Sequence, residues 1–158
     1  MTIDVRGMAP LLQVFDMPRS LAFYRDALGF EVVSTAGTAP HFGWVLLRLR
    51  DLELMLNTAY EPEARPDAPE LARVAAHRDT TLFFGCPDLE AVYRRVQAHG
   101  VSVEPPVRTG YGFRALSLHD PDGYGLCFHW PESPESIAEW QRRYGFDPAA
   151  VIPHRDDR

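Results

Sequence analysis

The fold of this chain is decided by the stretch VFDMPRSLAFYRDALGF, residues 14–30. A predicted strand, residues 10–15, leads into it, and Asp16 stands where a helix N-cap is expected, with Pro18 in the first turn. The apolar residues at helical spacing are Leu21, Tyr24 and Leu28. Gly29 supplies the left-handed residue that ends many helices. The stretch therefore predicts a strand, a helix and a stop before the next strand.

The same pattern returns about 71 or 72 residues later. Residues 81–86 are typical of a strand, Asp88 is the expected helix cap, and Gly100 is the expected stop. The apolar stripe of this second helix consists of Leu89, Val92 and Val96. One repeat at this distance indicates the duplication of a supersecondary unit and not a solenoid.

Three more strand-like runs follow each predicted helix. They lie at residues 30–34, 44–49 and 52–56 in the first repeat, and at residues 101–103, 113–118 and 125–130 in the second. Each repeat is thus predicted to be a βαβββ module. The predicted fold class is α+β, with a curved mixed sheet around a cleft. Module one spans about residues 8–58 and module two about residues 80–131, within one domain of residues 1–131.

Two further segments lie outside these modules. Residues 59–79, which hold three prolines among acidic residues, are expected to form an exposed linker with a short helix at residues 71–76. Residues 132–158 form an extension with a predicted amphipathic helix, capped by Ser133 or Ser136, and a polar tail, residues 153–158. Its apolar face consists of Ile137, Trp140 and Tyr144. We expect this face to cover a sheet edge or a dimer seam, in preference to forming a lid over the binding site.

Composition excludes several classes of function. The net charge is −6 and the arginines are scattered, so no basic stripe for nucleic acid is expected. All 16 basic residues are Arg, which excludes chemistry that needs a lysine. Cys86 and Cys127 form no CxxC motif and are expected to be free thiols. The sequence contains no signal-peptide pattern and no membrane-spanning apolar run, so we expect a cytoplasmic protein without a membrane partner.

Two motifs carry a resemblance to a known superfamily. Residues 14–30 resemble the opening strand and helix of the vicinal oxygen chelate superfamily of glyoxalases, bleomycin-resistance proteins and dioxygenases. The stretch DPDGYG, residues 120–125, is similar to the turn before the last strand of those proteins, with Pro and Gly at the positions that a tight turn favours. The resemblance covers about residues 8–131 and implies a small-molecule cleft.

The same resemblance implies four positions for metal ligands. They correspond to Ala9, Glu53 or Met55, Thr81 and Cys127. Only Glu53 and, weakly, Cys127 have side chains that bind metals, whereas a catalytic site generally needs three protein ligands. The departure points to the metal-free, bleomycin-resistance-like branch. A relocated site made by Gln13, Glu53 and His129 is the alternative.

Strand alternation separates a helix-packed face from a cleft face. The helix-packed set is Leu12, Val14, Val45, Leu47, Leu49, Leu52, Leu54, Leu56, Leu82, Phe84, Leu116, Leu118, Leu126 and Phe128. The predicted ligand-binding residues are Gln13, Phe15, Trp44, Arg48, Glu53, Met55, Phe83, Phe113, Cys127 and His129, with Tyr111 on a loop. Rings with a few polar groups are typical of a ligand pocket, although a second core or a subunit interface has the same composition. The other histidines, His41, His77, His99 and His119, are expected to be exposed.

Some of these residues allow more than one role. Glu53 could attract a cation or act as a base, but a cross-strand pair with Arg48 is the simpler expectation. Trp44, Phe83 and Phe113 are predicted to face a common cavity.

We expect a protein that binds a small aromatic or cationic molecule, needs no cofactor and does not catalyse a reaction. By resemblance it would sequester an antibiotic-like compound and form a homodimer. The alternatives are a metal-dependent lyase, isomerase or dioxygenase with the relocated site, and a non-catalytic dimeric scaffold.

Overall fold

The structure is a computed structural model that describes residues 3–145, so the predicted polar tail lies outside the described residues. The chain divides into two compact units. The first comprises residues 1–79 and 120–124, and the second comprises residues 80–119 and 125–158. Across residues 3–145, none of the helices is long and apolar enough to cross a bilayer.

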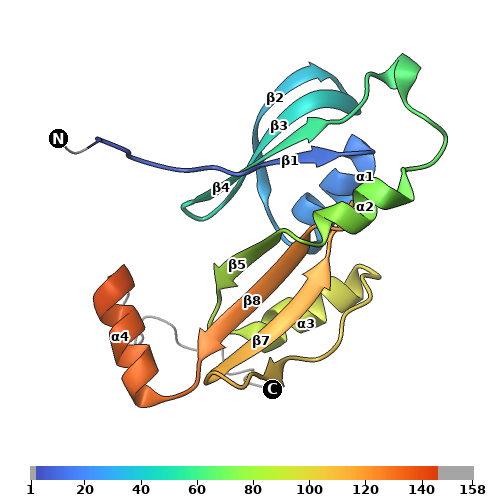
Figure 1. Ribbon diagram of the computed structural model, residues 1–158. Helices are drawn as coiled ribbons and strands as arrows, with labels where there is room; N and C mark the ends of the chain where they lie inside the picture. The colour runs from blue at the N-terminus through green and yellow to red at the C-terminus, as the bar shows by residue number, and fades with distance from the viewer. Residues whose placement is uncertain (1–2, 146–158) are drawn as a thin grey trace, which may run out of the picture. The chain divides into compact units, whose positions relative to one another are not determined.

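The first unit contains a four-stranded mixed sheet with the strand order β1-β4-β3-β2 (Figure 1). Its strands are β1 (Leu11–Val14), β2 (Glu31–Thr38), β3 (His41–Leu49) and β4 (Leu52–Thr58). β1 pairs with β4 in parallel, while β2–β3 and β3–β4 are antiparallel. A helical segment joins β1 to β2, so this unit contains the predicted βαβββ module.

The helical segment after β1 changes its hydrogen bonding midway. α1 (Met17–Leu21) starts at Asp16, whose carboxylate accepts the backbone N–H of Arg19 at 3.3 Å. The chain continues as a π-helix, η1 (Ala22–Ala27), where a uniform α-helix was predicted. The N–H of Leu28 donates to the carbonyl of Phe23, five residues back, at 3.0 Å. Gly29, with φ of 87°, then ends the segment as predicted.

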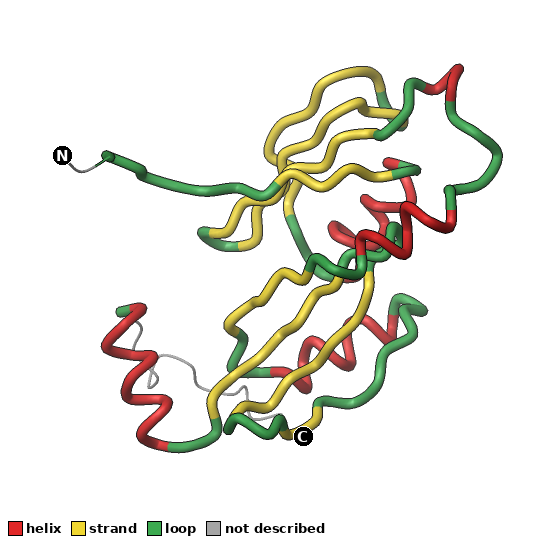
Figure 2. The backbone as a smooth tube through the Cα atoms, in the orientation of Figure 1, coloured by secondary structure: helices red, strands yellow, loops and turns green. Residues whose placement is uncertain are grey.

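The second unit repeats this arrangement. Its strands are β5 (Thr81–Gly85), β6 (Val107–Arg108), β7 (Phe113–His119) and β8 (Gly125–Pro131), in the order β5-β8-β7-β6. β5 and β8 are parallel and the other pairs antiparallel. α3 (Leu89–Ala98) begins at Asp88, whose carboxylate accepts the Ala91 N–H at 2.9 Å, and packs against β7 and β8 (Figure 2). The extension forms α4 (Pro134–Tyr144), which is capped by Ser133 and not by Ser136.

Burial separates the two faces of each sheet as the alternation predicts. The buried members of the predicted helix-packed set are Leu12, Val14, Val45, Leu47, Leu54, Leu56, Leu116, Leu118, Leu126 and Phe128. Leu49, Leu82 and Phe84 are half-buried. Leu52 is exposed, against the prediction, because it lies at the tip of the β3–β4 hairpin beside Arg50, which has φ of 53°.

Two predictions about local structure need correction or extension. Residues 101–103 are not a strand. On the side of β7 away from β8, the pairing strand is the two-residue β6, which follows two prolines that offer no N–H to a sheet. The predicted short helix is α2 (Leu71–His77). It follows a single 3-10 turn, η2 (Pro62–Ala64), within the segment that was predicted to be a linker.

The turn of residues 120–124 is part of the first unit and not of the second. It is the predicted tight turn, since the Gly123 N–H donates to the Asp120 carbonyl at 3.1 Å. The Asp120 carboxylate accepts the Tyr24 hydroxyl at 2.8 Å, and the Asp122 carboxylate accepts the Phe15 N–H at 2.7 Å. Both aspartates are buried, and burial raises the pKa of each above its ordinary value. The turn is therefore a polar anchor inside the first unit.

Candidate ligand-binding site

The helix-free face of the first sheet carries a row of polar and aromatic side chains. Gln13, Asn57 and Trp44 are neighbours across β1, β4 and β3. The Asn57 side-chain amide donates to the Gln13 side-chain carbonyl at 3.1 Å. This bond occupies one acceptor of Gln13 and holds Asn57 beside the Trp44 position. Met55, another predicted site residue, is half-buried on the same face of β4.

A pocket of about 430 Å³ opens at one end of this row. Rings come from Phe42 and Trp44 of β3 and from Tyr60, which follows β4. Polar groups come from Asn57, Thr58 and His41. The remaining lining residues are Met17, Ala36, Gly37, Gly43, Glu61, Pro62 and Arg65. The volume lies within the range of about 300–1,000 Å³ that is usual for small-molecule sites.

Two charged residues line this pocket, and they differ in whether a charge of the opposite sign lies nearby. Arg65 pairs with Asp16 at 3.3 Å, and its guanidinium lies 5.7 Å from the centre of the Phe15 ring. Its positive charge is therefore matched locally. Glu61 is exposed, and within residues 3–145 it forms no ion pair. The rim therefore carries one carboxylate that is available to a ligand.

Phe15, a predicted site residue, lies next to the pocket residues but does not line the pocket. Its ring meets Tyr60 edge to face with centroids 6.0 Å apart, and Arg65 covers it. Phe15 thus packs against Tyr60 and Arg65, two residues that line the pocket.

Arg48 and Glu53 form the expected cross-strand pair. They are register partners on β3 and β4, and the Arg48 guanidinium donates to the Glu53 carboxylate at 2.7 Å. Both side chains are partly exposed, so the pair contributes little to stability. The pairing satisfies the Glu53 charge and favours neither a cation site nor a general base at this position.

The face of the second sheet opposite α3 carries a cluster of rings. His129 lies 5.3 Å from Phe83 and 5.2 Å from Phe113, with Phe113 nearly parallel to it. Phe83 is 60% exposed, which is unusual for a large apolar ring. Burial lowers the pKa of His129 below its ordinary value of 6.5 and thereby favours the neutral ring, which is suited to stacking. We call Phe83, Phe113 and His129 the ring face.

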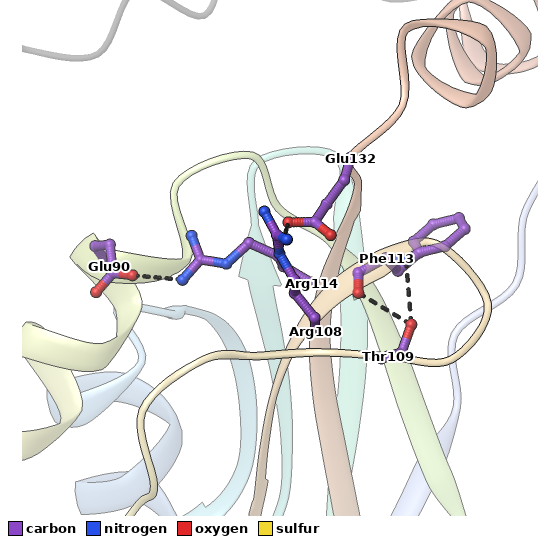
Figure 3. A network of polar contacts seen from close by, with 6 residues as sticks. All are labelled: Glu90, Arg108, Thr109, Phe113, Arg114 and Glu132. Carbon is purple, nitrogen blue, oxygen red and sulfur yellow. Dashed lines mark hydrogen bonds and ion pairs between the residues drawn. The ribbon is translucent and has the colours of Figure 1, made fainter.

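Tyr111 lies on a loop beside the ring face, 5.7 Å from Phe113. Hydrogen bonds close this loop at its base: the Thr109 hydroxyl donates to the Phe113 carbonyl at 3.0 Å and accepts the Phe113 N–H at 3.1 Å (Figure 3). Gly112, with φ of 83°, makes the turn possible. Tyr111 is 64% exposed and could reach a ligand from this loop.

Two ion pairs link neighbouring elements of the second unit. Arg114 pairs with Glu90 of α3 at 2.8 Å, and Arg108 of β6 pairs with Glu132 at 3.1 Å (Figure 3).

Cys127, another predicted site residue of the second unit, is buried in the sheet. It is thus unlike the other predicted site residues of this unit, whose rings reach the surface.

The inherited metal positions do not suit a metal ion. Ala9 and Thr81 have no metal-binding side chain of the usual kind, Glu53 is bonded to Arg48, and Cys127 is buried. Within the described range 3–145, no three His, Cys, Asp or Glu side chains gather in a group that could hold a metal ion. We therefore derive no chemistry through a metal. The relocated site stays a prediction, with Gln13 and Glu53 in the first unit and His129 in the second.

Sequence reasoning missed most of the pocket. Of its lining residues, only Trp44 was predicted. Tyr60, Glu61 and Arg65 belong to the segment that was expected to be an exposed linker. Among the histidines that were expected to be exposed, His77 is not, because it stacks on Tyr124 with centroids 4.1 Å apart.

The comparisons with known proteins agree with this fold. A sequence model of the Glyoxalase/Bleomycin resistance protein/Dioxygenase superfamily matches residues 8–128, and the chain belongs to this superfamily. No functionally curated protein matches it significantly.

Three solved structures illustrate the similarity. TnmS3, an antibiotic binding protein from Streptomyces sp. CB03234, is 21% identical with a TM-score of 0.61, and the match covers 83% of this chain and 100% of that chain. TioX from Micromonospora sp. ML1 is 16% identical with a TM-score of 0.60, over 80% and 100% of the two chains. A glyoxalase/bleomycin resistance protein/dioxygenase from Nocardioides is 18% identical with a TM-score of 0.58, over 84% and 88%. At these identities the likeness establishes the fold alone.

Proposed function

We propose that this protein binds flat aromatic small molecules, without a metal ion, on the ring-lined faces of its two sheets. The observation that carries the proposal is the pocket of about 430 Å³ in the first unit. Phe42, Trp44 and Tyr60 offer apolar area for a ligand ring, and the side-chain oxygen atoms of Asn57 and Thr58 can accept hydrogen bonds that orient it. This combination is suited to reversible binding.

The rim charge favours a ligand with a positive group. Arg65 is matched by Asp16, whereas Glu61 is available, so the pocket offers a cationic ligand an attraction that it does not offer an anion. We therefore propose cationic, planar aromatic compounds as the ligand class.

We propose sequestration of an antibiotic-like compound as the biological role. The support is the superfamily itself and the likeness in fold to TnmS3, which is described as an antibiotic binding protein. Binding alone suffices for this role, and it requires no metal at the positions where the ligands are missing.

We also propose that residues 1–131 form the functional domain and that it works as a homodimer. β1 and β5 are edge strands of their sheets, so each has one side that is unpaired within its own sheet. Light scattering should give about twice the chain mass of 17.9 kDa. A monomer at micromolar concentration would contradict the dimer and leave the pocket proposal intact.

The pocket is tested with proflavine, a planar cationic three-ring dye, titrated into the full-length protein. Trp44→Ala should weaken binding about tenfold or more, because truncating a ring anchor costs about as much as burying one stabilises. Trp44→Phe should retain most of the affinity. Unchanged binding in Trp44→Ala, with an unchanged circular dichroism spectrum, would show that this pocket is not the site.

The charge preference has a matched pair of variants. Glu61→Gln should weaken proflavine binding, and the loss should shrink as salt rises because the carboxylate is exposed. Glu63→Gln changes an equally exposed neighbour that does not line the pocket and should have no effect. Equal effects of the two variants would reduce the role of Glu61 to that of general surface charge.

A further inference from the structure

Trp140 of α4 lies on the ring face of the second sheet. Its ring centroid is 5.5 Å from Phe113 and 5.2 Å from His129, and it meets both edge to face. It also contacts β5, since a Cβ atom at Gly85 would lie 3.0 Å from the Trp140 ring. Trp140 thus touches residues of β5, β7 and β8, among which β5 is an edge strand of the sheet.

These distances leave no room for a ligand between Trp140 and the ring face. A ring inserted between two others needs about 7 Å between their centres, because aromatic carbons approach to about 3.5 Å. Trp140 is closer than that to both Phe113 and His129. An aromatic ligand that uses this part of the ring face must therefore take the place of the indole.

α4 is seated in a way that allows such displacement. Its half-buried side chains are Ser136, Ile137, Trp140 and Gln141, and none of its described side chains is buried. Both ends of the helix are capped by residues that flank it: the Ser133 hydroxyl accepts the Ser136 N–H at 3.1 Å, and Gly145 has φ of 68°. An element with few buried apolar contacts nevertheless opens at a low free energy, and a helix as short as α4 is only marginally stable when it is undocked, so its amides should lose protection.

We propose that Trp140 is an intramolecular competitor that occupies the ring face until a larger aromatic ligand displaces it. The inference rests on the proposed function, because it concerns the ring face as a binding surface. Trp140 thereby sets a lower limit on ligand size. A fused system of three rings can make contacts as extensive as those of the indole that it displaces, whereas a single ring makes fewer. The apparent affinity of the ring face for a ligand is reduced by the fraction of molecules in which Trp140 is docked.

The test compares proflavine with benzamidine, a cation with one ring, in the full-length wild-type and Trp140→Ala proteins. Trp140→Ala should bind both probes about fivefold or more tightly and by a similar factor, because the loss of the competitor raises the competent fraction equally for each probe. Phe113→Ala in the Trp140→Ala background should abolish the gain. Glu139→Ala changes an exposed neighbour on α4 and should match the wild type.

Hydrogen exchange of residues 134–143 gives a second measurement. Proflavine should accelerate exchange of α4 in the wild type, and Gly85→Ala should accelerate it without ligand, because the added methyl group crowds the Trp140 ring and weakens its docking. Equal or weaker binding by Trp140→Ala, or an α4 that stays protected in the proflavine complex, would overturn the competitor. Failure of the proposed function is distinct: it would appear as the absence of proflavine binding, or as binding that no Trp44, Glu61 or Phe113 variant changes.

Discussion

Tyr24→Phe should destabilise the first unit through the loss of one buried hydroxyl. Tyr24 is fully buried, and its hydroxyl donates to the Asp120 carboxylate at 2.8 Å. A hydrogen bond to a charged group contributes about 1.5–3 kcal/mol, and its loss leaves a carboxylate oxygen with one partner fewer. We expect a loss of about 2 kcal/mol, which corresponds to a fall in Tm of about 4–8 °C for a chain of this size.

Thermal unfolding followed by circular dichroism measures this loss, and a double-mutant cycle assigns it. Tyr24→Phe and Asp120→Asn should be non-additive by about 1 kcal/mol or more, because they remove the two ends of one bond. Tyr93→Phe is the control, since its hydroxyl accepts an exposed hydrogen bond from Gln97, and it should change stability by about 0.5 kcal/mol or less. Additive losses, or equal effects of the two tyrosine variants, would refute the assigned role of the Tyr24–Asp120 bond.

Three further predictions concern the anchor turn, its pH dependence and metal. Gly123→Ala should lower the Tm by more than Tyr24→Phe in the same melts, because φ is 93° there and a Cβ would collide with the Val74 carbonyl. Burial raises the pKa of Asp120 above 3.8, so the contribution of Asp120 to the free energy of unfolding is greatest below that value and is lost as the pH rises. Thermal melts from about pH 4 to about pH 7 should therefore show Asp120→Asn gaining stability relative to the wild type. Chelator should leave the Tm unchanged, and near-stoichiometric metal that disappears in Glu53→Ala would contradict the metal-free proposal.

The elements of the fold were predictable because their signals are local. Asp16 and Asp88 cap helices with the hydrogen bonds that their positions predict. Alternation along β4 placed Leu54 and Leu56 in the core, with Glu53 and Met55 on the other face. β6 was missed because two residues between loops carry no periodicity.

The pocket was not predictable because it depends on contacts between distant segments. Phe42 lies at the start of β3, and Tyr60 lies in the segment after β4, whose prolines and acidic residues are equally typical of a linker. The same holds for the turn of residues 120–124. Its sequence predicts the turn, but the burial of Asp120 and Asp122 depends on Tyr24 and Phe15, about a hundred residues away.

The turn of residues 120–124 also bears on how the duplicated halves of the chain can be separated. β7 and β8 belong to the second unit, yet the five residues that join them are part of the first. A fragment that begins at Thr80 would carry Asp120 and Asp122 without the groups that bond to them. The first half of the chain thus completes its compact unit with five residues from the second half. We therefore expect a chain cleaved between residues 79 and 80 to remain associated, and the separately expressed halves to fold only when mixed.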